Sequence, residues 1–260
     1  MKVQGTKFDR TPLISVIMPA YNSAKYIEQS IKSVQGQSYE NWELLVIDDA
    51  SSDETTVIIK DLAKEDCRIK LHVNDSNQGT AWCRNYAAQI SQGEFVAYLD
   101  SDDIWYADKL GRQLSVLAKS DVDLVYCSYG YIDEAGVRSP KIFRVPEQVT
   151  LKQMLKQNVI GCSTVMVKKA VAAQYRFSSQ YYLEDFVLWL SMLKDKKQLY
   201  GLTDALVDYR IRKNSRSNNK LLCAKHRWTV FREFLKFSRL KSMYYMVQYA
   251  TAGIIKYINR

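Results

Sequence analysis

Three carboxylates stand within four residues at the end of an apolar segment. Asp100, Asp102 and Asp103 follow directly on residues 94–99, which have the composition of a buried strand. Carboxylates this close repel one another, and a buried strand gains nothing by ending on them unless they share a cation. Proteins bind Mg²⁺ and Mn²⁺ through one or two carboxylates together with the phosphates of a substrate. The spacing predicts a divalent cation site, with an acidic turn that caps the next helix as the structural alternative.

A second pair of acids, Asp48 and Asp49, ends the apolar segment 43–47. A carboxylate at such a strand end can accept a hydrogen bond from the imide N–H of a pyrimidine base. The alternative is that Asp48 caps the helix expected next, as Asp53 most simply does. Both readings stay open on sequence alone.

Arg84 stands in a helix-like segment that follows Asn77-Gln78-Gly79. The planar fork of a guanidinium facing the acids could bind a base or a phosphate. A solvated arginine on the helix surface explains the spacing equally well.

Glu184 and Asp185 precede the apolar segment 186–190. Acids at this position commonly complement the positive end of a helix. The functional interpretation is a carboxylate that deprotonates a hydroxyl group.

Several other chemistries are disfavoured by the residue inventory. The chain has only two histidines, His72 and His226, so neither a Ser-His-Asp arrangement nor a histidine metal site is supported. No G-x-G-x-x-G or P-loop pattern occurs. The five cysteines form an odd set without a C-x-x-C pair, which favours reduced thiols in a cytosolic compartment.

Strand-like and helix-like segments alternate over residues 13–99, which predicts an α/β fold with a mostly parallel sheet flanked by helices. Ligands of such sheets bind beyond the carboxyl ends of the strands, where Pro19, Ala20, Tyr21 and Asn22 would join the acids. The strands are expected at 13–18, 43–47, 69–73 and 94–99, and later at 124–129, 163–167 and 205–210; the helices are expected at 28–34, 53–63, 80–90, 109–119 and 151–157, with another from Glu184, and residues 133–146 are expected to form turns.

In this order the segments resemble the family 2 glycosyltransferases of the GT-A fold, a Rossmann-like architecture. The resemblance covers roughly residues 12–215 and rests on the ordered series of motifs. The matching segments are 15–22, 43–53, Asn77-Gln78-Gly79 with Arg84-Asn85, 93–103, and Glu184-Asp185 with Trp189.

The resemblance implies a metal-dependent enzyme that moves a sugar from a nucleotide donor, usually UDP-linked, to an acceptor hydroxyl with inversion. It also implies the roles of the residues. Asp185 is the expected base, with Glu184 as second choice, and Asp102 and Asp103 are the expected ligands of Mn²⁺ or Mg²⁺. The nucleotide-sugar would contact Pro19, Ala20, Tyr21, Asn22, Asp48, Asp49, Arg84, Asp100 and Ser101, and Arg210 and Arg216 would contact the diphosphate.

Processive relatives carry a Q-x-x-R-W motif and transmembrane helices. Here Ala224 occupies the Gln position before Arg227-Trp228, which favours addition of a single sugar. We expect a catalytic domain over 1–217, with a nucleotide-sugar half at 12–103 and an acceptor half at 104–217, and a basic tail over 218–260. The family also implies bacterial O-antigen or capsule assembly, with glucose or galactose transferred to an undecaprenyl-diphosphate-linked sugar.

The net charge of +9 is concentrated at one end of the chain. Residues 209–260 hold 13 of the 37 Lys and Arg but only one of the 28 Asp and Glu, so this segment carries +12 and the remainder −3. The spacing over residues 225–241 predicts one amphipathic helix, either lying in a membrane interface or packing on the catalytic domain. The apolar stretch 242–255 is too short to span a bilayer. We expect a cytoplasmic enzyme, peripheral on the inner membrane, that does not bind nucleic acid; a homodimer stays open.

Two rival functions are weighed against a transferase. A sugar-phosphate nucleotidyltransferase also needs carboxylate-bound Mg²⁺, but usually has a glycine-rich phosphate loop with a lysine, which Pro19-Ala20-Tyr21-Asn22 lacks. A non-catalytic module that binds sugar or lipid would not need acids at both strand ends and at Asp185.

Overall fold

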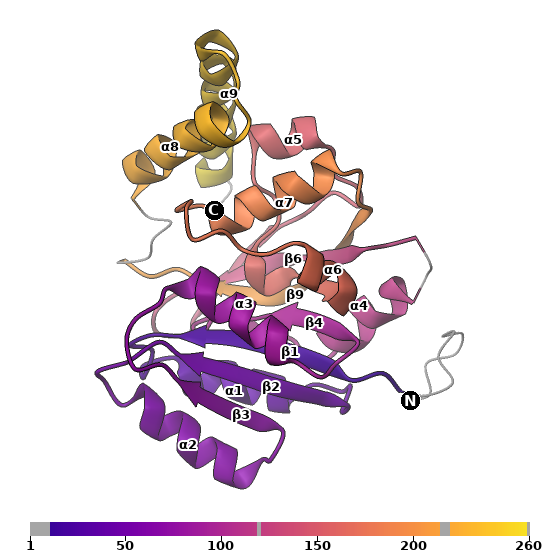
Figure 1. The fold of residues 1–260 in the computed structure, drawn as a ribbon, viewed down its shortest axis with the longest axis vertical. Helices are drawn as coiled ribbons and strands as arrows, with labels where there is room; N and C mark the ends of the chain where they lie inside the picture. Colours follow the sequence, from indigo (N-terminus) through magenta and orange to yellow (C-terminus); the bar gives the residue numbers. More distant parts are fainter. Residues whose placement is uncertain (1–10, 119–120, 214–218, 259–260) are drawn as a thin grey trace.

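A single mixed sheet forms the centre of the molecule (Figure 1). The computed structural model describes residues 11–118, 121–213 and 219–258, with side chains up to residue 253. Over these residues the strands run in the order β3-β2-β1-β4-β8-β6-β9-β5, and β7 pairs with β6. Their bounds are β1 Ile14–Ala20, β2 Trp42–Asp48, β3 Ile69–Val73, β4 Phe95–Tyr98, β5 Ile104–Trp105, β6 Leu124–Ile132, β7 Arg138–Phe143, β8 Met166–Lys168 and β9 Leu199–Arg210.

The first half of the sheet is parallel, as the alternation of segments predicts. β1 pairs in parallel with β2 and β4, and β2 pairs in parallel with β3. Every residue of β1 and β2 is buried, which explains their nearly continuous apolar sequences. β8 then pairs antiparallel with both β4 and β6 and joins the two halves.

Helices cover both faces of the sheet. One face carries α1 Ile27–Gln35, α2 Thr55–Glu65 and α4 Lys109–Leu117, and the other carries α3 Thr80–Ile90, α5 Leu151–Lys156, α6 Lys169–Gln174 and α7 Glu184–Lys194. α1 packs through Ile27, Ile31 and Val34, which the helical period places on one side. The α/β expectation is therefore confirmed.

The C-terminal segment differs from the expected single helix over 225–241. α8 Lys220–Thr229 continues as a π-helical segment, Val230–Phe234, and α9 Arg239–Ile258 begins after a break at Lys236, whose φ is 53°. Val230, Phe231 and Tyr245 belong to the main core, so this segment packs on the body that contains the sheet. Phe231 lies in this core and Leu235 packs against it. Figure 1 shows α8 and α9 as two separate helices near α5 and α7.

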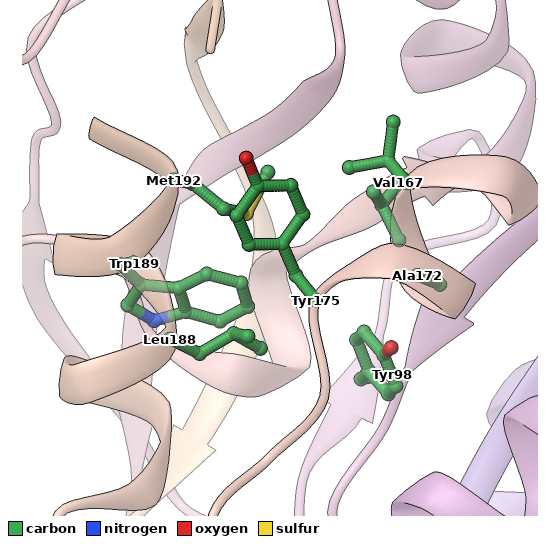
Figure 2. A pocket seen from close by; sticks show the side chains of 8 residues that line it. Tyr98, Val167, Ala172, Tyr175, Leu188, Trp189 and Met192 are labelled. Carbon is green, nitrogen blue, oxygen red and sulfur yellow. The ribbon is translucent and has the colours of Figure 1, made fainter. Parts of the chain in front are cut away.

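A small void of about 10 Å³ remains in the core between α6 and α7. Figure 2 shows Tyr98, Tyr175 and Trp189 among the side chains around it. Its walls are almost entirely apolar and it has room for about one water molecule, so it is a packing defect and not a ligand site.

Candidate active site

A cavity of about 970 Å³ opens at the carboxyl ends of β1 and β4. This is large enough for a nucleotide-sugar, and it lies where ligands of parallel sheets bind. One side of its wall comes from the loops after β1, β2 and β4, and the other comes from the start of α7 and from α8 and α9. Expected site residues on the wall are Pro19, Ala20, Tyr21, Asp49, Arg84, Asp100, Ser101, Asp102, Asp103, Glu184 and Asp185.

Asp49 shapes the loop that precedes α3. Its carboxylate accepts hydrogen bonds from the amide of Asn74 at 2.7 Å and from the backbone N–H groups of Gln78 and Gly79, both at 2.8 Å. Gly79 has φ 86°, a conformation that favours glycine. Asp49 thus holds this loop next to the cavity. Tyr21, which is 52% exposed, lines the same cavity.

Asp48 and Asn22, both expected to contact the nucleotide-sugar, are not among the cavity-lining residues. The Asp48 carboxylate is fully buried and accepts hydrogen bonds from the hydroxyls of Ser51 and Thr56. It does not cap α2, whose N-cap is Glu54. Asn22 accepts a hydrogen bond from the backbone of Ser52 at 2.9 Å. Both side chains therefore organise the loops behind the wall.

Arg84 joins two acidic segments that lie far apart in the sequence. Its guanidinium is 4% exposed and pairs with Asp100 at 2.6 Å and with Glu184 at 3.2 Å. A buried guanidinium flanked by two carboxylates is well compensated in charge. Arg84 therefore lies at the wall, as expected, but its fork is occupied by protein carboxylates.

Asp102 and Asp103 lie in a region crowded with negative charge. Burial raises the pKa of Asp102 to about 6; Arg212, whose Nε lies 2.6 Å from its carboxylate, opposes that rise. Burial, reinforced by Asp102 and Asp100, raises the pKa of Asp103 well above its usual range. Because the pKa values of both carboxyl groups are raised in spite of these contacts, an added cation would stabilise their ionised forms.

Arg210, expected at the diphosphate, has a structural position instead. Its guanidinium is buried and donates to the backbone oxygens of Asp102 and Asp133 and to the side chain of Gln29. Arg212, two residues further, lines the cavity and was missed by the sequence reasoning, although it belongs to the same basic segment. Arg216 lies outside the described residues.

Asp185 faces the cavity from the first turn of α7. One carboxylate oxygen accepts the backbone N–H of Phe186 at 2.7 Å, and the amide of Asn158 lies 3.4 Å from the other. Burial, with the neighbouring charge of Glu184, raises the pKa of Asp185 to about 6. A carboxylate with a pKa near neutrality suits proton abstraction, whereas Glu184 is held by Arg84.

The carboxylates that line the cavity could supply some of the ligands of a divalent cation. Among the residues that the structure describes, no three His, Cys, Asp or Glu side chains are arranged to hold a metal ion on their own. Asp102 nevertheless presents hard oxygen donors at the cavity wall, in surroundings that disfavour its ionised form. These residues fit a Mg²⁺ or Mn²⁺ ion that takes its remaining ligands from substrate phosphates and water.

The sheet, its flanking helices and the cavity at the strand ends define a protein of the GT-A fold. The mannosyltransferase PcManGT from Pyrobaculum calidifontis, solved in complex with GDP-Man and Mn²⁺, superimposes with a TM-score of 0.74 over 95% of this chain and 74% of its own, at 20% identity. That likeness concerns the fold.

The family model "Glycosyl transferase family 2" matches residues 15–179, and the chain belongs to this family; it is a glycosyltransferase. Two Escherichia coli relatives are both named UDP-Glc:alpha-D-GlcNAc-diphosphoundecaprenol beta-1,3-glucosyltransferase. WfgD is 38% identical over 94% of this chain and 95% of its own, and WfaP is 34% identical over 80% and 81%.

Proposed function

We propose that the enzyme moves one hexose, glucose or galactose, from a UDP-sugar to a hydroxyl of an undecaprenyl-diphosphate-linked sugar, with inversion. The activities in the names of WfgD and WfaP support UDP-glucose as the first donor to test and a diphosphate-linked GlcNAc as the first acceptor. Assembly of a bacterial O-antigen or capsule repeat unit is the process that such an acceptor suggests.

The observation that carries the proposal is the position of Asp185 in the same cavity as the Asp100-Ser101-Asp102-Asp103 turn. As the acceptor oxygen bonds to the anomeric carbon, the Asp185 carboxylate takes the hydroxyl proton. The bond from the anomeric carbon to the UDP oxygen breaks, and its electron pair leaves with the diphosphate. A base with a pKa near 6 is largely ionised at neutral pH and still basic enough to assist.

The donor would lie along the wall made by the strand ends. Ala20, Tyr21 and Asp49 would contact the uracil, and Asp100 and Ser101 would contact the ribose. Asp102, with Asp103 beside it, would hold Mg²⁺ or Mn²⁺, which neutralises the charge that develops on the leaving diphosphate. Arg212, which pairs with Asp102, would lie near the same diphosphate.

The test is a donor and acceptor screen with the full chain. UDP release from UDP-glucose, UDP-galactose and GDP-mannose is measured with Mn²⁺ and a synthetic GlcNAc-α-diphosphate that carries a long alkyl chain. We expect acceptor-dependent release of UDP and a disaccharide product with inverted linkage. Pyrophosphate formation from UTP and a sugar phosphate would favour the nucleotidyltransferase instead, and binding without turnover would favour the non-catalytic module.

We further propose that the outer face of α9 places the enzyme on the cytoplasmic leaflet of the inner membrane. Leu240, Met243, Tyr244 and Val247 follow the helical period and are 86%, 57%, 50% and 54% exposed. Exposed basic residues stand beside it, Arg239 and Lys241 in the first turn of the same helix and Lys236 at the break before it. An apolar helical face flanked by positive charge is complementary to an anionic bilayer surface. Among the described helices, none is long and apolar enough to cross a bilayer.

Flotation with vesicles of anionic and of purely zwitterionic phospholipid tests this face. The variant Leu240→Glu with Val247→Glu should lose binding to anionic vesicles, whereas the matched control Val57→Glu, on the exposed side of α2, should bind like the unaltered chain. Removal of the whole tail is a poor test because Val230, Phe231 and Tyr245 are part of the core. Equal flotation of both variants would refute the assignment, and self-association without vesicles would favour a homodimer.

A further inference from the structure

One cation in the cavity has no carboxylate partner. Arg227 of α8 lines the cavity, is 4% exposed and takes part in no ion pair among the residues that the structure describes. Its Nε has no hydrogen-bond partner in the described part of the chain, one terminal nitrogen lies 3.5 Å from the backbone oxygen of Leu155, and the guanidinium also makes a side-chain hydrogen bond with Tyr249. This contrasts with Arg84, whose charge is matched by two carboxylates.

Aromatic rings fix the guanidinium in place. The Arg227 carbon Cζ lies 4.1 Å from the ring centre of Phe186 and 4.0 Å from that of Tyr249. Cation–π contacts compensate part of the lost hydration, but a buried charge still favours a counter-ion. Burial accordingly lowers the pKa of Arg227 to about 10, in spite of opposing contributions from Tyr249 and Asp185. The site is therefore built to receive an anion.

The position of Arg227 indicates whether this anion belongs to the acceptor or to the donor. Phe186, against which it packs, directly follows Asp185, and Tyr249 comes from α9 on the same side of the cavity. In a displacement with inversion, the attacking hydroxyl and the leaving diphosphate lie on opposite faces of the transferred sugar. A cation beside the base is therefore placed toward the acceptor, and the donor diphosphate belongs with Asp102 and Arg212.

We propose that Arg227 binds the diphosphate that links the acceptor sugar to its lipid. This inference rests on the proposed function and deepens it, because it assigns the recognition of the acceptor's anionic linkage to a residue of the C-terminal helices. The guanidinium fork matches two phosphate oxygens, and since no carboxylate of the described segments forms an ion pair with Arg227, its charge is available for them. The lipid would then leave the cavity between α8 and α9.

The test compares two acceptors that differ only in the linkage. One is GlcNAc-α-diphosphate with a long alkyl chain, and the other is the same alkyl chain joined to GlcNAc by a simple α-glycosidic bond. The unaltered enzyme should prefer the diphosphate by about 10- to 100-fold in kcat/KM, as one buried charge-assisted contact allows. Arg227→Met should reduce this preference to about onefold, mainly by raising KM for the diphosphate acceptor.

Controls separate a binding role from a structural one. Lys225→Met removes a positive charge from an exposed position of the same helix and should keep the preference. Methionine can fill the space between the two rings, so Arg227→Met should unfold at or above the temperature of the unaltered chain. An unchanged preference, an equal loss with both acceptors, or a marked loss of stability would overturn the inference. Failure of the unaltered enzyme to use either acceptor would refute the proposed function itself, and this role of Arg227 with it.

Discussion

Replacement of Asp185 by Asn should abolish turnover and at the same time stabilise the fold. In the folded protein, burial and the charge of Glu184 raise the pKa of Asp185 from 3.8 to about 6. The folded state therefore holds a proton between about pH 4 and pH 6 that the unfolded state has lost. The free energy of unfolding falls as the pH rises through this window. Above it, the buried ionised carboxylate destabilises the folded state by a constant amount, and Asn has no such cost.

The size of the effect follows from the shift. A difference of about 2 pKa units corresponds to about 3 kcal/mol above pH 6. The side-chain oxygen of Asn can still accept the hydrogen bond from the N–H of Phe186. Its NH₂ group cannot accept the 3.4 Å hydrogen bond that Asn158 donates to Asp185, and this loss lowers the stability by about 1 kcal/mol. We expect a net gain of about 2 kcal/mol at pH 8, or a rise of about 0.7 M in the urea midpoint.

Urea unfolding at pH 8 and at pH 4, followed by tryptophan fluorescence, measures the difference. The gain should be present at pH 8 and absent at pH 4, where Asp185 is protonated in the folded state and partly protonated in the unfolded state, so that most of the electrostatic difference is gone. The control Glu184→Gln should destabilise at pH 8, because it removes a partner of the buried Arg84. UDP binding should survive in the Asn variant. A loss of stability in Asp185→Asn at pH 8, or a gain that does not depend on pH, would refute the electrostatic reasoning.

Three further outcomes are expected. Asp102→Ala should lower metal-dependent transfer at least about 100-fold in a UDP-release assay, and full activity of the unaltered enzyme in EDTA would contradict the metal assignment. Arg84→Met should destabilise by about 3–5 kcal/mol in urea unfolding, because Asp100 and Glu184 lose their shared cation; a change below about 1 kcal/mol would show that the pairs are unimportant. Ala50→Gly should raise stability by about 1 kcal/mol, because Ala50 has φ 62°, and an unchanged midpoint would exclude strain at this turn.

The first half of the fold could be predicted because its signals are local. The bounds of β3 and α3 agree with the expected 69–73 and 80–90, since apolar periodicity and Gly79 mark them in the sequence. β7 was expected as turns because it is an exposed strand that contains Pro140. α8 and α9 were merged because the break at Lys236 carries neither Gly nor Pro.

The sequence predicted most of the residues that line the site, but it did not predict which of their side chains pair with one another. The acids at the strand ends do reach the cavity, apart from Asp48, because parallel strands end at one edge. The pairing of Arg84 with Glu184 depends on how α3 and α7 pack, and no local pattern records a contact between segments so far apart. Arg210 ends β9 and its guanidinium is held by backbone oxygens, whereas Arg212 follows the strand and reaches the cavity; the sequence carries no signal that separates the two.

The two sides of the cavity come from different stretches of the chain, so donor specificity and acceptor specificity can evolve separately. The strand ends of residues 19–103 lie at one side, and the helices after residue 219 at the other. Substitutions on α8 and α9 can therefore change what enters from that side while the opposite side stays intact. A related enzyme could keep its sugar nucleotide and acquire a new acceptor if α8 and α9 were replaced. The apolar contacts of Val230, Phe231 and Tyr245 would have to be kept. Chimaeras between relatives joined in the 214–218 segment are the natural way to use this division.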